Sequence, residues 1–141
     1  MNNIDAIDKA NLRLEKLREY LVILQSLQGV TGKELQEDIN KRAKAERFLQ
    51  LASEACIDIS ELVISDQRFQ MPQNGREAIE ILGREHVLEL EFSRKFASVA
   101  SFRNILVHDY MEIDYDEVAD KINNHLGDFD IFAKKIARFL I

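Results

Sequence analysis

The stretch LELEFSRKFASVASFRNILV, residues 88–107, spaces its large apolar side chains as an α-helix does. These residues follow one another in steps of three or four and share one helical face: Phe92, Phe96, Val99, Phe102 and Leu106. A face of this kind has to be buried against another element. The stretch therefore predicts a helix over 88–107 that packs into a core.

Two longer stretches carry the same periodicity. Over residues 3–28 an apolar stripe, with members seven residues apart and others between them, predicts a first helix that packs in the core rather than at a dimer seam. Its members are Ile7, Ala10, Leu14, Leu17, Leu21 and Leu24. A second helix is predicted over 32–64, with a buried face made of Leu35, Ile39, Ala45, Leu49, Ala52, Cys56, Ile59 and Val63.

Three capping residues, each followed three positions later by Glu, mark helix starts: Thr31 with Glu34, Asn74 with Glu77, and Asp114 with Glu117. The second pair predicts a short third helix that ends between residues 83 and 86. The third pair predicts a last helix from residue 114 or 115 to the end of the chain. Together with 88–107, these helices predict an all-α bundle of about five helices in a single domain, residues 1–141.

The composition agrees with a compact helical domain. The chain has 141 residues, of which 46% are hydrophobic and 31% charged, with five Gly and a single Pro, Pro72. So few turn residues argue against an all-β fold, and so much apolar content argues against disorder.

The net charge of −6 argues against a protein that coats nucleic acid through a basic surface. All of this excess lies in one acidic segment, residues 112–130, where seven acids stand against the single base Lys121. The rest of the chain is balanced. We therefore expect RNA binding, if any, to be weak and salt-sensitive, and to depend on a few local cations.

A single cysteine, Cys56, excludes an internal disulfide and favours a reducing compartment, for which the cytoplasm is the default. The charged N-terminal sequence does not have the apolar core of a signal peptide, and the longest apolar run, residues 20–24, is too short to span a bilayer. We expect neither secretion nor membrane insertion.

The candidate chemistry lies at the end of the predicted helix 88–107, in the sequence Ser101-Phe-Arg-Asn-Ile-Leu-Val-His-Asp-Tyr110. Arg103 and His108 are the side-chain types that metal-independent RNA cleavage requires. A histidine takes a proton from the 2′-hydroxyl or gives one to the leaving 5′-oxygen, and a guanidinium binds the phosphate as charge develops. Asn104 adds a neutral donor and acceptor that orients the phosphate or the imidazole.

The spacing of these two residues is not that of an ordinary pair on a helix surface. Five residues turn an ideal helix by about 500°, so Arg103 and His108 point roughly 140° apart. The spacing is suited to a histidine on the last, fraying turn, or to residues that meet their counterparts across a symmetric dimer. The structural alternative is that Arg103 pairs with an acid and His108 caps a helix end.

The string from Arg103 to Tyr110 resembles the Arg-x4-His-x-Tyr signature of HepT-like toxins, which belong to the HEPN superfamily of all-α ribonucleases. The resemblance covers most of the chain, including the segments 46–59 and 109–115. It implies a homodimeric, metal-independent endoribonuclease without a cofactor, the toxin of a two-gene toxin–antitoxin module. It also implies Arg103 and His108 as the catalytic pair and Asn104 as a supporting residue.

The resemblance further implies a partner, a minimal nucleotidyltransferase of the MntA type that transfers AMP from ATP to Tyr110. An AMP group at Tyr110 brings bulk and a negative charge next to His108, which repels an RNA backbone and occupies Arg103. The alternative is a non-catalytic helical scaffold that serves as substrate for the nucleotidyltransferase and docks it through residues 112–130. A plain helical regulator with a structural motif is a third reading.

The remaining candidates are weaker. Lys41, Lys44 and Arg47 line one face of the predicted helix 32–64, where they either contact RNA phosphates or form a solvated stripe. His86 and His125 have no motif around them and are interpreted as incidental. No His and Cys residues stand at metal-ligand spacing, so no metal site is predicted.

Overall fold

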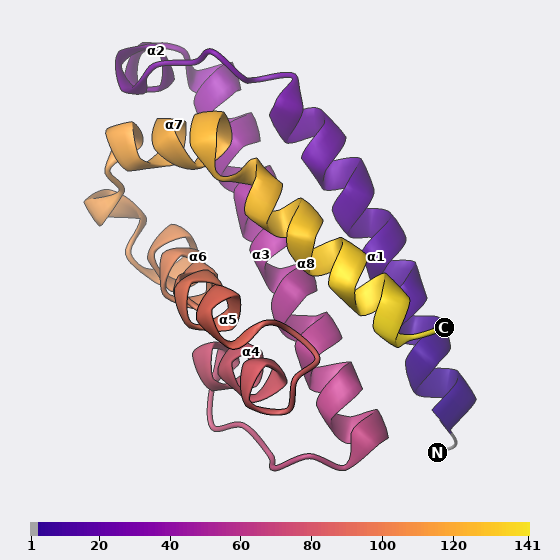
Figure 1. Ribbon diagram of the computed structural model, residues 1–141. Coiled ribbons are helices and arrows are strands. Elements are labelled where there is room, and N and C mark those ends of the chain that lie inside the picture. The colour runs from indigo at the N-terminus through magenta and orange to yellow at the C-terminus, as the bar shows by residue number, and fades with distance from the viewer. Residues whose placement is uncertain (1–2) are drawn as a thin grey trace.

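The computed structural model describes residues 3–141, and over this range it contains helices and no strands (Figure 1). Met1 and Asn2, the first residues of the predicted domain, lie outside the described residues. The described elements are α1 (Asn3–Gln25), α2 (Gly32–Glu37), α3 (Ile39–Gln67), α4 (Gly75–Arg84), α5 (Leu90–Phe96), α6 (Ser98–His108), the 3₁₀ turn η1 (Tyr110–Glu112), α7 (Tyr115–Asn124) and α8 (Leu126–Phe139).

Two long helices form the spine of the molecule. Helix α1 packs along α3, and α8 lies against both of them (Figure 1). At one end of the spine α2 contacts α7, and toward the other end α4 and α6 pack on α3, with α5 against α4. The predicted all-α class is confirmed, whereas the predicted number of about five helices is too low.

The prediction of one helix over 32–64 is wrong because Asp38 interrupts it. The backbone of Asp38 is extended, with φ −109° and ψ 102°, and its carboxylate accepts hydrogen bonds from the backbone N–H groups of Asn40 and Lys41. An aspartate that caps a helix start competes with helix continuation. As a result Ile39, predicted on the buried face, is 66% exposed.

Two other predicted helices are also divided. The helix over 88–107 starts at Leu90 and is interrupted at Ala97, where the flanking hydroxyls of Ser93 and Ser98 donate to the carbonyls of Leu90 and Lys95. Hydroxyls that bond to nearby carbonyls in this way disturb a helix ladder. The last predicted helix is divided at His125 between α7 and α8.

The predicted core is largely confirmed. The stripe of α1 is buried from Ala10 to Leu24, although Ile7 at its start is only partly covered, and Cys56 is fully buried. Phe96 joins the end of α5 to α8 by stacking on Phe132 at 5.3 Å between ring centroids. This contact fixes the position from which α6 starts.

The three predicted helix starts are confirmed as caps. Thr31 and Glu34 form the reciprocal capping box, Asn74 accepts from the backbone of Glu77, and Asp114 accepts from the first turn of α7. Within residues 3–141, no helix is both long enough and apolar enough to cross a membrane.

Candidate functional site

Helix α6 presents Arg103 toward α3. Phe102 and Leu106 are buried and anchor α6 in the core, which leaves Arg103 on the flank that faces Glu54 of α3. Arg103 Nε donates to Glu54 Oε1 at 3.4 Å, and the two side chains are 34% and 29% exposed. The structural alternative foreseen from the sequence, an acid paired with Arg103, is therefore present in the fold.

This ion pair is part of a short polar chain. Gln50 Nε2 donates to the same Glu54 oxygen at 3.0 Å, and Arg103 Nη1 donates to Asn104 Oδ1 at 3.0 Å. The guanidinium thus donates hydrogen bonds through Nε to Glu54 and through Nη1 to Asn104. A guanidinium fixed in this way is oriented to bind an anion.

More acidic residues continue along the same face of α3. Asp58 pairs with Arg13 of α1, with 3.6 Å between Nε and Oδ2, and Glu61 lies one turn further on. Burial and the nearby charge of Asp58 raise the pKa of Glu61, and the charge of Arg103 partly offsets this shift. Glu61 therefore contributes unfavourable electrostatic energy to the folded protein when it is ionised.

A pocket of about 440 Å³ opens beside Arg103, between α3, α4 and α6. Its lining consists of Ile57, Glu61, Asn74, Gly75, Arg76, Ala100, Ser101, Arg103 and Asn104. Two residues of the predicted catalytic motif, Arg103 and Asn104, thus form part of a cavity wall. His108 does not line this pocket.

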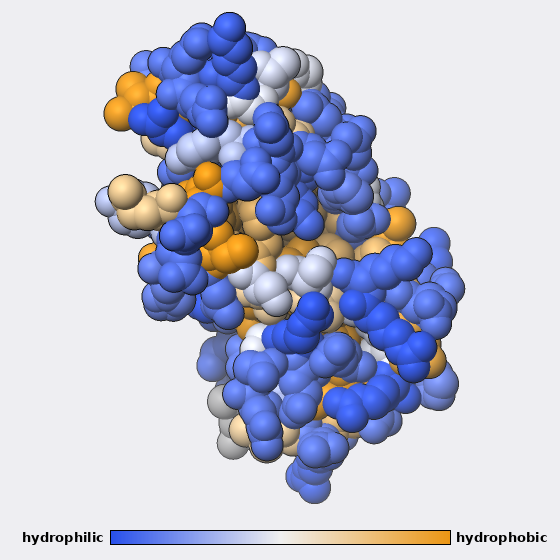
Figure 2. All heavy atoms as spheres, turned by 90° about the vertical axis from the view of Figure 1, so that its left-hand side faces the viewer, coloured by the Kyte–Doolittle hydropathy of each residue, from blue (hydrophilic) through white to orange (hydrophobic). Residues whose placement is uncertain are grey.

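His108 and Tyr110 lie at the surface where α6 ends. His108 is the last residue of α6 and is exposed, Asp109 is the C-cap, and Tyr110 begins η1 with 63% of its surface exposed. Neighbouring Met111 is 82% exposed. On the face of the molecule that carries α4 to α7, apolar side chains of this kind stand out among mostly hydrophilic ones (Figure 2).

The fold of one chain does not join the two motif residues. Within residues 3–141, no hydrogen bond or ion pair links Arg103 to His108. Both belong to α6, so an ideal helix places them about 7.5 Å apart along its axis and about 140° apart around it. On a single chain, the two side chains therefore leave α6 in different directions and do not converge on one phosphate.

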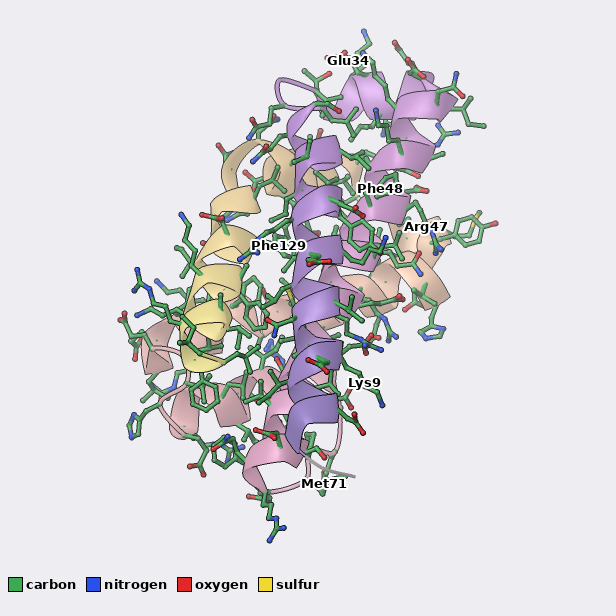
Figure 3. All side chains as sticks on the ribbon, turned by 90° about the vertical axis from the view of Figure 1, so that its right-hand side faces the viewer. Lys9, Glu34, Arg47, Phe48, Met71 and Phe129 are labelled. Carbon is green, nitrogen blue, oxygen red and sulfur yellow. The ribbon has the colours of Figure 1, made fainter. Side chains whose placement is uncertain are left out.

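The basic residues of α3 are not part of this cluster. Lys41, Lys44 and Arg47 are all exposed, and Arg47 projects from α3 at the surface (Figure 3). Lys41 Nζ forms an ion pair with Glu34 at 3.2 Å. This arrangement agrees with a solvated stripe, and RNA contact by these three residues stays a prediction.

Four residues near Arg103 were not predicted from the sequence: Gln50, Glu54, Glu61 and Arg76. Gln50 and Glu54 are four residues apart, but such pairs are common on helices, and no pattern marks the other two. Tyr115 was not predicted either, and its hydroxyl donates to Glu46 Oε1 at 2.7 Å. Burial and this hydrogen bond raise the pKa of Tyr115 to about 12.

The other two histidines lie apart from the motif. His86 is exposed, with a left-handed backbone at φ 63°, in the loop after α4. The imidazole of His125 lies between Asp120, at 3.1 Å, and Asp128, at 3.5 Å, where it bridges α7 and α8. Among residues 3–141, no three His, Cys, Asp or Glu side chains are grouped so that they could hold a metal ion.

The all-helical fold, with this motif at the end of α6, defines a ribonuclease domain of the HEPN type. Residues 13–136 match the family model described as Ribonuclease HepT-like, and the chain belongs to that family. The enzyme class predicted from the motif, an endoribonuclease, is thereby confirmed at the level of the family.

Two curated relatives cover nearly the whole chain. The mRNA nuclease HepT of Shewanella oneidensis is 28% identical over 120 residues, which are 85% of this chain and 90% of the relative. The tRNA nuclease HepT of Aphanizomenon flos-aquae is 28% identical over 141 residues, which are 100% of this chain and 95% of the relative. The two relatives differ in the kind of RNA in their names, so the family alone does not define a target.

Solved structures agree with this assignment. The tri-AMPylated HEPN toxin of Shewanella oneidensis in complex with its MNT antitoxin has a TM-score of 0.83 at 28% identity, with 98% of this chain and 99% of that chain covered. A toxin–antitoxin structure with AMP-PNP has a TM-score of 0.80 at 27% identity, with 96% and 99% covered. The resemblance recognised in the sequence is confirmed.

Proposed function

We propose that this chain is the toxin of a two-gene toxin–antitoxin module and cleaves RNA in the cytoplasm without a metal ion. The observation that carries the proposal is the position of Arg103, which is held by Glu54 and Asn104 at the rim of a pocket. His108 is exposed at the end of the same helix. These residues resemble the Arg-x4-His-x-Tyr signature noted in the sequence, and they lie within residues 13–136, which match the family model.

In the proposed reaction one His108 removes the proton of the ribose 2′-hydroxyl, and the 2′-oxygen attacks the adjacent phosphorus. The bond from phosphorus to the 5′-oxygen breaks, and the leaving oxygen receives a proton from a second imidazole. The products are a 2′,3′-cyclic phosphate and a 5′-hydroxyl. Arg103 binds the phosphate oxygens as negative charge develops on them, and Asn104 positions the guanidinium.

The second imidazole comes from a second copy of the chain. A twofold axis near the end of α6 brings two copies of His108 and two of Arg103 to one cleft, although they diverge on a single helix. The exposed apolar side chains of Val107 and Met111 beside His108 support contact with another protein surface at this end of α6.

Tyr110 is the proposed off switch. In the reaction with a partner nucleotidyltransferase, Tyr110 Oη attacks the α-phosphorus of ATP, pyrophosphate leaves, and the phenolic proton passes to solvent. The 63% exposure of Tyr110 supports access by such a partner, and the AMP product stands two residues from His108. The related tri-AMPylated toxin with its MNT antitoxin supports this class of partner.

The direct test is RNA cleavage by the purified protein in the presence of EDTA. We expect cleavage with cyclic phosphate ends and its loss in His108→Ala, whereas the control His86→Asn, which changes an exposed histidine outside the motif, retains full activity. Cleavage that persists in His108→Ala contradicts the mechanism. Cleavage by the wild type that is lost in EDTA contradicts the absence of a metal ion.

A second measurement tests the switch. After incubation with ATP and a nucleotidyltransferase of the MntA type, mass spectrometry should find AMP on Tyr110, together with loss of cleavage. Tyr110→Phe should cleave RNA and resist inhibition, whereas the control Tyr20→Phe should be inhibited as the wild type is. Modification of a protein that never cleaves RNA supports the scaffold instead.

A further inference from the structure

The pocket beside Arg103 has the dimensions of a small-molecule site. Its volume of about 440 Å³ lies within the range of about 300–1,000 Å³ that is typical of ligand pockets. Three helices form it, because α4 and α6 both pack on α3 (Figure 1). The cavity is therefore a product of the fold and not of a single loop.

Part of the wall is apolar. Ile57 of α3 and Ala100 of α6 are 9% and 4% exposed, so they offer small nonpolar surfaces to the cavity. Gly75, the first residue of α4, has no side chain here, and a Cβ in its place would approach Ile57 Cδ1 to 3.0 Å. Glycine thus allows α4 to lie close to this wall. A narrow apolar surface of this kind suits a flat, aromatic group such as a nucleobase.

The rest of the wall offers hydrogen-bonding groups of both kinds. Glu61 is an acceptor when it is ionised, Arg76 is a donor, and Ser101 supplies a hydroxyl. Within the described part of the chain, neither Glu61 nor Arg76 forms a hydrogen bond or an ion pair through its side chain. Both groups are therefore available to a ligand.

Proximity to Arg103 identifies the class of ligand, and this step depends on the proposed function. Arg103 lines the same pocket and is the group proposed to bind the scissile phosphate. In a nucleotide attached to that phosphate, only the ribose separates the phosphate from the base. The base next to the cleaved bond therefore reaches the space between Ile57, Ala100 and Glu61.

We propose that this pocket binds a guanine base adjacent to the cleaved phosphate, with Glu61 and Arg76 as the residues that determine specificity. Guanine presents two neighbouring donors, N1–H and the 2-amino group, to a carboxylate, and two acceptors, O6 and N7, to a guanidinium. Cytosine and adenine each have an amino group, but neither has both the pair of donors for Glu61 and the pair of acceptors for Arg76. Uracil presents a carbonyl where Glu61 requires a donor.

Sequencing the ends of RNA fragments cleaved from a random oligoribonucleotide library tests the proposal. We expect guanine on one side of the cut to be enriched about a hundred-fold, because each of the two bidentate contacts supplies discrimination of about ten-fold. Glu61→Gln and Arg76→Ala should each reduce this enrichment to about ten-fold, as the loss of one contact predicts. The control Glu19→Gln removes the same charge from an exposed acid on α1 that pairs with Lys16, and it should leave the enrichment unchanged.

Binding of a mononucleotide gives a readout that does not require cleavage. In the His108→Ala protein, guanosine 3′-monophosphate should shift the NMR signals of the Ile57 methyl groups and the Ala100 amide, and uridine 3′-monophosphate should shift them far less. Glu61→Gln should weaken the guanosine interaction about ten-fold.

The outcomes separate this inference from the proposed function. RNA cleavage with an even base composition at the cut, or a preference unchanged in Glu61→Gln, overturns the guanine site and leaves the ribonuclease intact. Absence of cleavage by the wild type overturns the proposed function. In that case the NMR experiment still tests the guanine site. If guanosine and uridine 3′-monophosphate shift the signals of Ile57 and Ala100 equally, or if neither nucleotide shifts them, the proposed guanine site is wrong.

Discussion

The contact between Glu54 and Arg103 predicts that an acid on α3 controls the rate of RNA cleavage. The change that tests this is Glu54→Gln, which keeps an oxygen in place to accept from Gln50 and Arg103 but removes the negative charge. Without that charge the guanidinium is held less firmly against α3. We therefore expect Arg103 to sample positions in which it does not face the phosphate.

The magnitude follows from the geometry of the pair. A hydrogen bond between charged groups contributes about 1.5–3 kcal/mol, whereas an exposed ion pair contributes about 0–1 kcal/mol. The distance from Arg103 Nε to Glu54 Oε1 is 3.4 Å, and about a third of each side chain is exposed, so we place the contact near 1.4 kcal/mol. If this energy is lost from the transition state, kcat falls about ten-fold.

The assay is steady-state cleavage of a fluorogenic oligoribonucleotide, with kcat and KM measured separately. For Glu54→Gln we expect a fall in kcat with KM changed by less than about two-fold, because orientation matters most in the transition state. The free energy of unfolding should fall by no more than about 1.4 kcal/mol, the energy assigned to this contact. The control is Glu19→Gln, which removes an exposed carboxylate of α1 and should leave kcat unchanged.

A double-mutant cycle decides whether Glu54 acts through Arg103. If it does, Glu54→Gln has no further effect on kcat in a protein that already carries Arg103→Ala. A ten-fold loss in both backgrounds would show that the two residues act independently and would refute the reasoning. So would an increase in kcat for Glu54→Gln, since the ion pair would then restrain Arg103 away from the substrate.

Two further predictions concern stability. Burial and the hydrogen bond to Glu46 raise the pKa of Tyr115 to about 12, above the value near 10 of an unfolded tyrosine. We expect the wild type to be more stable than Tyr115→Phe by about 1 kcal/mol below pH 10. Between pH 10 and 12 it should lose up to about 2–3 kcal/mol relative to that variant, less what solvent screening removes, because the unfolded tyrosine ionises first. Urea unfolding of both proteins against pH measures this difference, and a difference that stays constant contradicts the assignment. Gly83→Ala should lower the free energy of unfolding by about 1–3 kcal/mol, because the added Cβ collides with Ser93 Oγ, and Gly127→Ala is the matched control with open space around it.

The helices were predictable from sequence because each depends on local spacing. The buried face of 88–107, the stripe of α1 and the caps at Thr31, Asn74 and Asp114 all follow from residues within a few positions of one another. The breaks were not predictable in the same way. An aspartate such as Asp38 can lie within a helix or cap a new one, and in this fold it caps α3 while α2 packs on α7. At His125 the break accompanies the packing of α8 on α1.

In the candidate site too, residues in a local pattern were predictable from the sequence and residues brought together by packing were not. The motif from Arg103 to Tyr110 is contiguous, so its resemblance to a family was visible in the sequence. Glu54 lies 49 residues before Arg103, and nothing in either local pattern relates them. The same holds for Glu61 and Arg76, which meet Arg103 only because α3, α4 and α6 surround one cavity. Contacts of this kind depend on tertiary packing, which periodicity does not encode.

Several acids of the acidic segment, residues 112–130, have structural roles in the helices that contain them. Asp114 caps α7, Asp120 and Asp128 bind His125 at the junction of α7 and α8, and Asp130 pairs with Lys134 at 2.8 Å. Much of this charge therefore stabilises helix ends, as carboxylates near helix N-termini do. Helix α7 contacts α2, whereas the pocket beside Arg103 lies between α3, α4 and α6. The lining of that pocket holds one acid, Glu61, and two bases, Arg76 and Arg103, so a net charge of −6 over the whole chain does not oppose the binding of a phosphate there.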